Sequence, residues 1–141
     1  MQKRMVGVIA IAMAVVGCGA SDDYANDPRP PAPINVAVSV KRDAVNVSPS
    51  HVGAGPARLI VTNLTAHSRD VEVTAPAGSS RGCVEADTSS GPINPRGTAH
   101  LAVDLRQGEC LIAVRGDHST RPARLTVGRE RPSAQDVLLQ P

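Results

Sequence analysis

Histidine is a common metal ligand in proteins, and its imidazole is the side chain from which a metal site in this chain is first considered. The 141 residues include four histidines: His51, His67, His100 and His118. His67 and His118 lie in segments of small polar residues that are typical of loops, and these loops can meet at one end of a β-sandwich. There the two imidazoles, with Asp117 or Asp70, would bind a divalent metal ion weakly. The alternative is that both histidines are simply exposed.

Serine is frequent, but no serine lies in the Gly-x-Ser-x-Gly context that exposes a nucleophile on a sharp turn. The segment Ser89-Ser90-Gly91 is predicted to be a loop. No pair of carboxylates stands out for acid–base chemistry. The sequence therefore predicts no catalytic residue and no enzymatic activity.

Arginine residues recur in the predicted loops, at Arg81, Arg96, Arg106, Arg115 and Arg121. Such residues can form a surface that binds an anion or a protein partner. The alternative is a mixed, solvated surface, because carboxylates are about as frequent as basic residues. The equal balance favours the mixed surface at this stage.

The elements that must position these residues are β-strands. Apolar side chains alternate with polar ones, a period of two that is typical of half-buried strands. The clearest example is residues 98–105, in which Ala99, Leu101, Val103 and Leu105 share one face. Strands of this kind are predicted over 34–40, 45–47, 57–63, 69–75, 98–105, 110–114 and 123–127. Turns separate them, including Gly53–Pro56, and no segment has a helical period.

The predicted strands indicate an all-β chain, a single Greek-key β-sandwich of about seven strands that is Ig-like in outline. Its core must consist of Val, Leu, Ile and Ala, because Phe and Trp are absent and Tyr24 is the only aromatic residue. The lack of aromatic side chains also argues against ligands that bind by stacking, such as single-stranded nucleic acid. Residues 78–94 are predicted to be a long polar loop.

The N-terminal segment has the pattern of an export signal. Lys3 and Arg4 precede an apolar run from Met5 to Gly17, which is too short to span a bilayer. The run ends in Val15-Val16-Gly17-Cys18, which resembles the lipobox of bacterial lipoproteins. The resemblance implies that residues 1–17 are removed and that Cys18 carries lipid. The protein would then be exported and anchored to the outer face of the cell membrane. The alternative is an ordinary secretory signal with an incidental cysteine.

The lipobox resemblance also affects the other cysteines and the charge. If Cys18 carries lipid, Cys83 and Cys110 remain, and in an exported protein such a pair favours a disulfide bond. Two free or metal-bound thiols are the alternative. Of the 15 Lys and Arg residues, two lie before Cys18, and the remaining 13 equal the 13 Asp and Glu residues. The mature domain is therefore neutral, which argues against a nucleic-acid partner.

Two stretches of the chain resemble cupredoxin-like domains. The first is Val45–Asn63, which contains Ser-Pro-Ser-His-Val-Gly-Ala-Gly and ends in Val-Thr-Asn. The second is Gly91–Val114, in which Asn-Pro-Arg-Gly-Thr leads into Val-Asp-Leu and Gln-Gly-Glu-Cys. Together they cover about a third of the chain. The resemblance implies a cupredoxin-like sandwich. Lipid-anchored domains of this kind also resemble exported lipoproteins of high-GC Gram-positive bacteria.

The same resemblance argues against copper. A blue-copper site uses two histidines, a cysteine thiolate and usually a methionine. The position of the first copper histidine holds Arg69, and that of the copper cysteine holds Val114. No methionine follows Met13. We therefore expect the cupredoxin-like fold without its copper ligands, and no cofactor.

The predicted organisation has four parts. Residues 1–17 form the signal peptide, 18–33 the lipidated cysteine and a proline-rich tether, 34–128 the sandwich, and 129–141 a tail. The predicted function is a non-enzymatic lipoprotein whose sandwich is a binding or structural module of the cell envelope. Its partners would be membrane lipid through Cys18 and an envelope protein that the sequence does not identify. The alternative is a metal-handling protein that uses His67 and His118.

Overall fold

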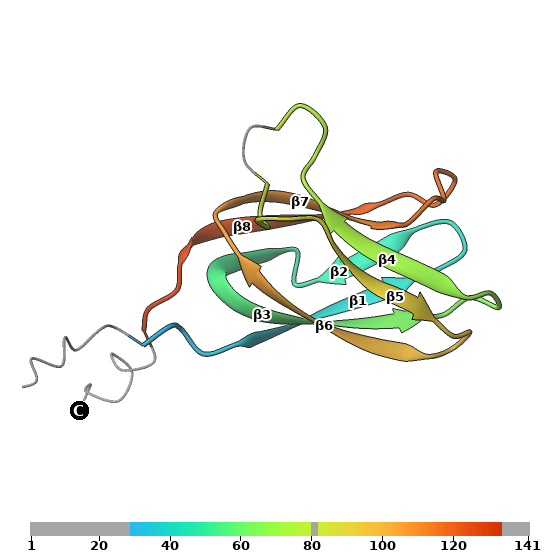
Figure 1. The fold of residues 1–141 in the computed structure, drawn as a ribbon, viewed down its shortest axis with the longest axis horizontal. Coiled ribbons are helices and arrows are strands. Elements are labelled where there is room, and N and C mark those ends of the chain that lie inside the picture. The colour runs from blue at the N-terminus through green and yellow to red at the C-terminus, as the bar shows by residue number, and fades with distance from the viewer. Residues whose placement is uncertain (1–28, 80–81, 134–141) are drawn as a thin grey trace, which may run out of the picture.

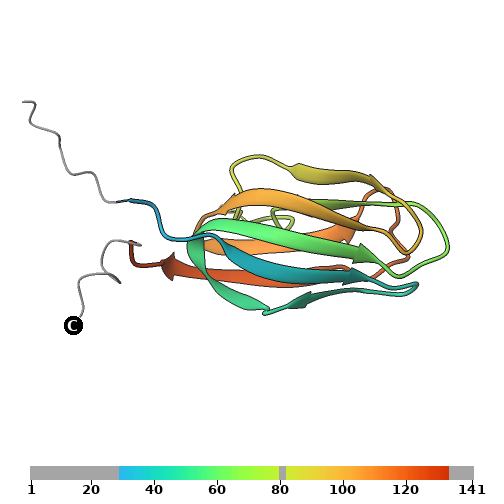
Figure 2. The same cartoon turned by 90° about the horizontal axis from the view of Figure 1, so that it is seen from below.

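The computed structural model describes residues 29–79 and 82–133, and these contain eight β-strands and no helix. The strands are β1 (Ile34–Val40), β2 (Val45–Ser48), β3 (His51–Asn63), β4 (Arg69–Thr74), β5 (Thr88–Ile93), β6 (Thr98–Leu105), β7 (Gly108–Val114) and β8 (Ala123–Glu130). They pack as two layers, seen edge-on in Figure 2. In the part of the chain that is described, no helix is long and apolar enough to cross a membrane.

One layer has the strand order β2-β1-β3-β6, and the other has β3-β8-β7-β4-β5 (Figure 1). The pairs β1–β3 and β3–β8 are parallel, and the other pairs are antiparallel. Parallel pairs of this kind require connections that pass between the layers. The two layers of strands, with no helix among the described residues, confirm the predicted all-β sandwich.

Strand β3 belongs to both layers. Its first residues pair with β8, and the rest pair with β1 and β6, with a register shift between Gly53 and Ala54. Gly55 has a φ of 117°, which a side chain would not tolerate. The predicted turn over Gly53–Pro56 is therefore wrong, because these residues lie within β3. The glycines bend one continuous strand as it passes from one layer to the other.

The structure adds β5 to the strands that the sequence predicted. It lies in residues 78–94, which were expected to be a loop. The strand escaped detection because Thr88–Ile93 is polar and includes glycine and proline, so its apolar residues do not alternate. It lies at the edge of its layer, where it pairs only with β4 among the described strands, and an edge position tolerates such a composition.

The core between the layers is aliphatic, as the composition predicted. Its fully buried side chains come from all the longer strands, because every second residue faces inward: Val36, Val40, Leu59, Val61, Val71, Val73, Ile112 and Leu125. The stripe on β6 that the sequence predicted also faces inward, with Val103 and Leu105 the most buried.

A disulfide bond joins Cys83, in the segment between β4 and β5, to Cys110 in β7. The two Cα atoms lie 5.3 Å apart, and both residues are fully buried. The Cys83 carbonyl also accepts a hydrogen bond from the Arg106 amide at 2.8 Å. The predicted pairing is confirmed, and it attaches the segment before β5 to the core.

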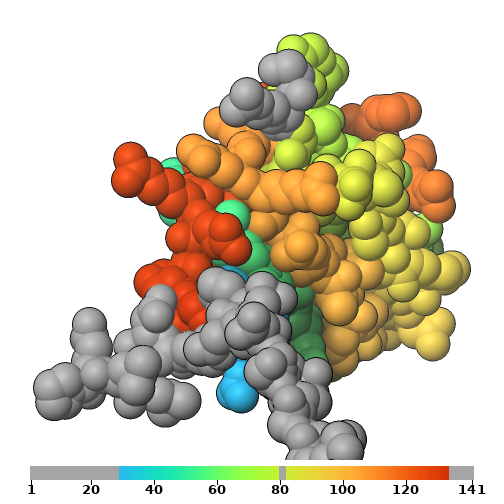
Figure 3. Space-filling view, turned by 60° about the vertical axis from the view of Figure 1, so that its left-hand side comes forward, coloured from blue at the N-terminus to red at the C-terminus, as the bar shows by residue number. Residues whose placement is uncertain are grey.

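Arg131 links both ends of the described chain. Its Nε donates to the Ala54 carbonyl at 3.1 Å and its Nη2 to the Pro56 carbonyl at 2.5 Å, while Nη1 donates to the Ala32 carbonyl. Figure 3 shows this end of the molecule, where the last described residues, in red, and the first described residues, in blue, are both visible. The last strand runs to Glu130, two residues beyond the expected boundary at 128.

Candidate functional site

Four connections meet at one end of the sandwich, which we call the loop end: residues 41–44, 64–68, 94–97 and 115–122. Strand register places them together. β1 and β3 run in parallel and finish there, β6 begins there opposite the end of β3, and β7 ends beside the start of β4. The described chain begins at the other end of the sandwich, which we call the entry end (Figure 1).

Asn63, the last residue of β3, organises the loop end from inside. It is completely buried. Its amide nitrogen donates to the carbonyls of His67, Ile93 and Asn94 at 2.8, 3.0 and 3.2 Å. Its amide oxygen accepts from the Thr65 amide and hydroxyl at 3.0 and 2.8 Å. Asn63 thereby holds residues 64–68 against the turn at 94–97, and it leaves no unpaired polar atom of its own.

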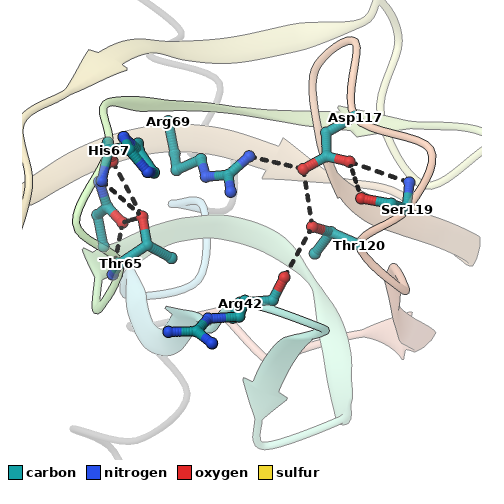
Figure 4. A network of polar contacts seen from close by, with 8 residues as sticks. Arg42, Thr65, His67, Arg69, Asp117, Ser119 and Thr120 are labelled. Atoms are coloured by element: carbon teal, nitrogen blue, oxygen red, sulfur yellow. Dashed lines mark hydrogen bonds and ion pairs between the residues drawn. The ribbon is translucent and has the colours of Figure 1, made fainter.

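A second polar network crosses the loop end (Figure 4). Arg69 Nη1 donates to Asp117 Oδ2 at 2.6 Å, with the side chains 20% and 21% exposed. Asp117 also accepts from the Ser119 hydroxyl at 2.5 Å, the Ser119 amide at 2.9 Å and the Thr120 hydroxyl at 2.9 Å. These hydrogen bonds from Ser119 and Thr120, with a smaller contribution from Arg69, hold the pKa of Asp117 well below its ordinary value.

The network continues to residues 41–44. The Thr120 hydroxyl lies 3.4 Å from the Arg42 carbonyl. The backbone is joined too, because the Arg121 amide donates to the Asp43 carbonyl at 2.9 Å and the Val45 amide to the Arg121 carbonyl at 2.8 Å. The connections of the loop end therefore form one hydrogen-bonded unit rather than independent loops.

A pocket of about 440 Å³ opens in this unit, a size typical of small-molecule sites. We call it the arginine pocket, because three of its seven lining residues are arginines: Arg42, Leu64, Thr65, Ala66, His67, Arg69 and Arg96. No described residue that lines it carries a carboxylate. Leu64 is 47% exposed. Among the described residues, no other large apolar side chain is exposed to this extent.

The histidines do not form the predicted metal site. His67 and His118 are both exposed, and in residues 29–79 and 82–133 no three His, Cys, Asp or Glu side chains are grouped so as to hold a metal ion. The structure therefore does not bring the two imidazoles together with Asp117 or Asp70 as three ligands. In Figure 4, His67 lies on the far side of Arg69 from Asp117.

The residues at the expected copper positions do not suit copper either. Arg69 carries a permanent positive charge and is bound to Asp117. Val114 is a buried core residue, and Cys110, four residues earlier, is in the disulfide bond. A blue-copper ion needs imidazole and thiolate ligands. The fold therefore lacks the ligands of that site at both positions.

The remaining candidates from the sequence are separate from the arginine pocket. Ser50 Oγ lies 3.1 Å from His51 Nδ1, but both residues are exposed at the start of β3, and no described carboxylate orients the imidazole. His100 is exposed on β6. Cys18 and Arg81 lie outside the described residues.

The loop arginines named from the sequence, for which a mixed surface was favoured over a binding surface, include members of two kinds. Arg106 pairs with Glu85 at 2.8 Å, and Arg115 lies 3.7 Å from Asp70 and 3.6 Å from Glu72. These belong to the mixed, solvated surface. Arg96 belongs to the arginine pocket. Sequence reasoning missed Arg42 and Arg69 as its neighbours, because only the pairing of distant strands brings them to Arg96.

The fold has counterparts among solved structures. Auracyanin A, a blue copper protein from the green thermophilic photosynthetic bacterium Chloroflexus aurantiacus, matches with a TM-score of 0.51 and 14% identity. The match covers 69% of this chain and 100% of that one. A reduced Cu(I) amicyanin variant matches with a TM-score of 0.47 and 15% identity over 65% of this chain and 80% of that one. Neither a known protein family nor a curated protein sequence matches the chain. The likeness to auracyanin A shows a cupredoxin-like fold and leaves function open.

Proposed function

We propose that this chain is an exported lipoprotein, held by lipid on Cys18 at the outer face of the cell membrane. Its disulfide-bonded, cupredoxin-like sandwich is a non-enzymatic binding module of the cell envelope. Binding takes place at the loop end, where an electron-transfer metal would sit in a blue-copper relative.

The observation that carries a binding role is the Arg69–Asp117 ion pair, 2.6 Å long. The pair lies where the resemblance expects a copper ligand, and it supports a rigid polar surface in place of a redox centre. The four connections around it are joined by hydrogen bonds, so the surface has a defined shape. A surface that is already ordered loses little conformational entropy when it binds a partner.

Two further features support the anchored arrangement. Val15-Val16-Gly17-Cys18 has the residue types of a lipobox. The described chain starts at the entry end, so a tether that leads back to Cys18 would leave the loop end facing away from the membrane (Figure 1).

The test is incorporation of labelled palmitate into the full chain expressed in a lipoprotein-processing bacterium. Wild type should be labelled and found with the membrane, and Cys18→Ala should lose both properties. The matched control is a Cys83→Ala/Cys110→Ala double variant, which removes the other two thiols and should stay labelled. Label that persists in Cys18→Ala contradicts the proposal.

A further inference from the structure

The arginine pocket has more positive charge than its surroundings neutralise. Three arginines line it, and Asp117 pairs with only one of them, Arg69. The guanidinium groups of Arg42 and Arg96 donate no hydrogen bond to a described residue, and they form no ion pair with one. Two of the three arginines that line the pocket thus carry positive charges without a partner in the described chain.

Arg69 contributes a further unsatisfied donor. Its Nε is buried and has no hydrogen-bond partner among the described residues. Buried polar groups in folded proteins are nearly always paired, so an exception calls for an explanation. The Arg69 guanidinium, which also lines the pocket, is therefore not fully satisfied by Asp117.

Arg96, which lines the pocket, has an unfavourable backbone conformation. In the turn from Asn94 to Gly97, the Gly97 amide donates to the Asn94 carbonyl at 2.9 Å. Pro95 takes the second position and Arg96 the third, with a φ of 58°. A turn of this type favours glycine or asparagine at the third position. Arg96 is the only described non-glycine residue with a positive φ, and residues held in such conformations cluster at functional sites.

We infer that the arginine pocket binds a phosphate monoester through Arg42, Arg69 and Arg96. A phosphate monoester carries close to two negative charges at neutral pH, which matches the two uncompensated guanidinium groups. Arginine donates two hydrogen bonds in parallel to phosphate oxygens. Leu64, exposed on the same pocket, contacts the organic part of the ester. The inference deepens the binding role proposed above by naming the ligand class.

The test is calorimetric titration of the full chain, purified in detergent, with phenyl phosphate and with inorganic phosphate at low ionic strength. Phenyl phosphate should bind saturably, and several-fold more tightly than inorganic phosphate, because its ring contacts Leu64. Arg42→Gln and Arg96→Gln should each weaken both ligands by about ten-fold or more. Leu64→Ala should weaken phenyl phosphate alone.

Matched controls separate specific binding from general charge. Arg58→Gln removes an exposed arginine of β3 that is not part of the pocket, and it should leave the affinity unchanged. Arg96→Gly provides a variant that suits the positive φ, so it should lose affinity while its melting temperature is not lowered. Absence of saturable phenyl phosphate binding to wild type, or equal losses in Arg58→Gln and Arg96→Gln, overturns the inference.

Two further ligands distinguish the source of the phosphate. If glycerol 3-phosphate and a short-chain phosphatidic acid bind with comparable affinity, the ligand of the pocket is a soluble phosphate ester. Binding of the phosphatidic acid at least about ten-fold more tightly assigns a lipid headgroup. The binding measurements do not depend on Cys18, so the ligand and the anchor fail or succeed separately.

Discussion

At the scale of single residues, Asp117 is the carboxylate that holds the loop end together. It receives hydrogen bonds from Ser119 and Thr120 and an ion pair from Arg69. Because these partners stabilise the ionised carboxylate, its pKa is lower in the folded chain than in the unfolded one. A group with a lowered folded pKa stabilises the fold above its unfolded pKa, and that stability is lost as the pH falls.

We predict that Asp117→Asn removes this pH dependence. Above about pH 5, where an unfolded aspartate is ionised, wild type should be more stable than the variant by a constant amount. The difference should shrink as the pH is lowered below about 4. Urea denaturation of both proteins over this range measures it. A difference that is the same at every pH contradicts the assignment.

Asn63 shows what sequence reasoning detects at this scale and what it misses. The sequence marks Asn63 as the end of a strand in a family pattern and as part of an Asn-x-Thr triplet. Its actual role also depends on the carbonyl groups of Ile93 and Asn94, which are about 30 residues away in the chain and lie beside it only because β5 is part of the folded sandwich. Local sequence carries no signal for contacts of this kind.

At the scale of elements, the disulfide bond attaches the segment between β4 and β5 to the core. Cys83 and Cys110 are 27 residues apart. A short backbone bridge between Gly82 and Glu109 accompanies the bond. The segment offers few other apolar contacts, so the disulfide replaces core packing there. The pairing could be predicted without knowledge of the fold, because setting Cys18 aside as the lipidated residue leaves one pair of cysteines.

We predict that the Cys83→Ala/Cys110→Ala double variant folds but is less stable than wild type by about 3–4 kcal/mol, the loop-closure entropy for a loop of this length. Urea denaturation under non-reducing conditions measures the loss. As a control, a reductant should destabilise wild type by a similar amount and leave the double variant unaffected. An unchanged midpoint in the variant would show that the segment is held by other contacts.

Strands with alternating apolar residues were predicted from sequence, whereas β5 and the first part of β3 were not. The alternation exists because one face of a strand is buried and the other is solvated. Thr88–Ile93 is partly exposed along most of its length, so selection for apolar residues is weak there. Gly53 and Gly55 signal a turn in most contexts, and only the two-layer arrangement makes them a bend within a strand.

At the scale of the whole molecule, the two ends of the sandwich are stabilised by different interactions. At the entry end, Arg131 joins the segment after β8 to Ala32 and to the bend in β3. At the loop end, hydrogen bonds between the connections support the arginine pocket. At the entry end, Gly53 and Gly55 leave space for the Arg131 side chain, because a Cβ atom at Gly53 would lie 2.6 Å from Arg131 Cγ.

We predict that Arg131→Ala destabilises the domain by about 1–3 kcal/mol, because it leaves the Ala54 and Pro56 carbonyls without their charged donor. Thermal and urea denaturation measure the loss. Arg124→Ala serves as the control, since Arg124 forms only an exposed ion pair with Glu109 and should cost less than about 1 kcal/mol. Equal effects in the two variants contradict a special role for Arg131.

The shared strand β3 has a consequence for how the protein is made. The start of β3 pairs with β8, the last strand, as in the pairing of His51 with Thr126. The layer β3-β8-β7-β4-β5 is therefore incomplete until β8 has left the ribosome, although the layer β2-β1-β3-β6 needs no residue beyond β6. Contacts between such distant segments also slow folding. The sandwich cannot close before β8 is available, so a chain exported as proposed above would reach a thread-through export channel while still unfolded.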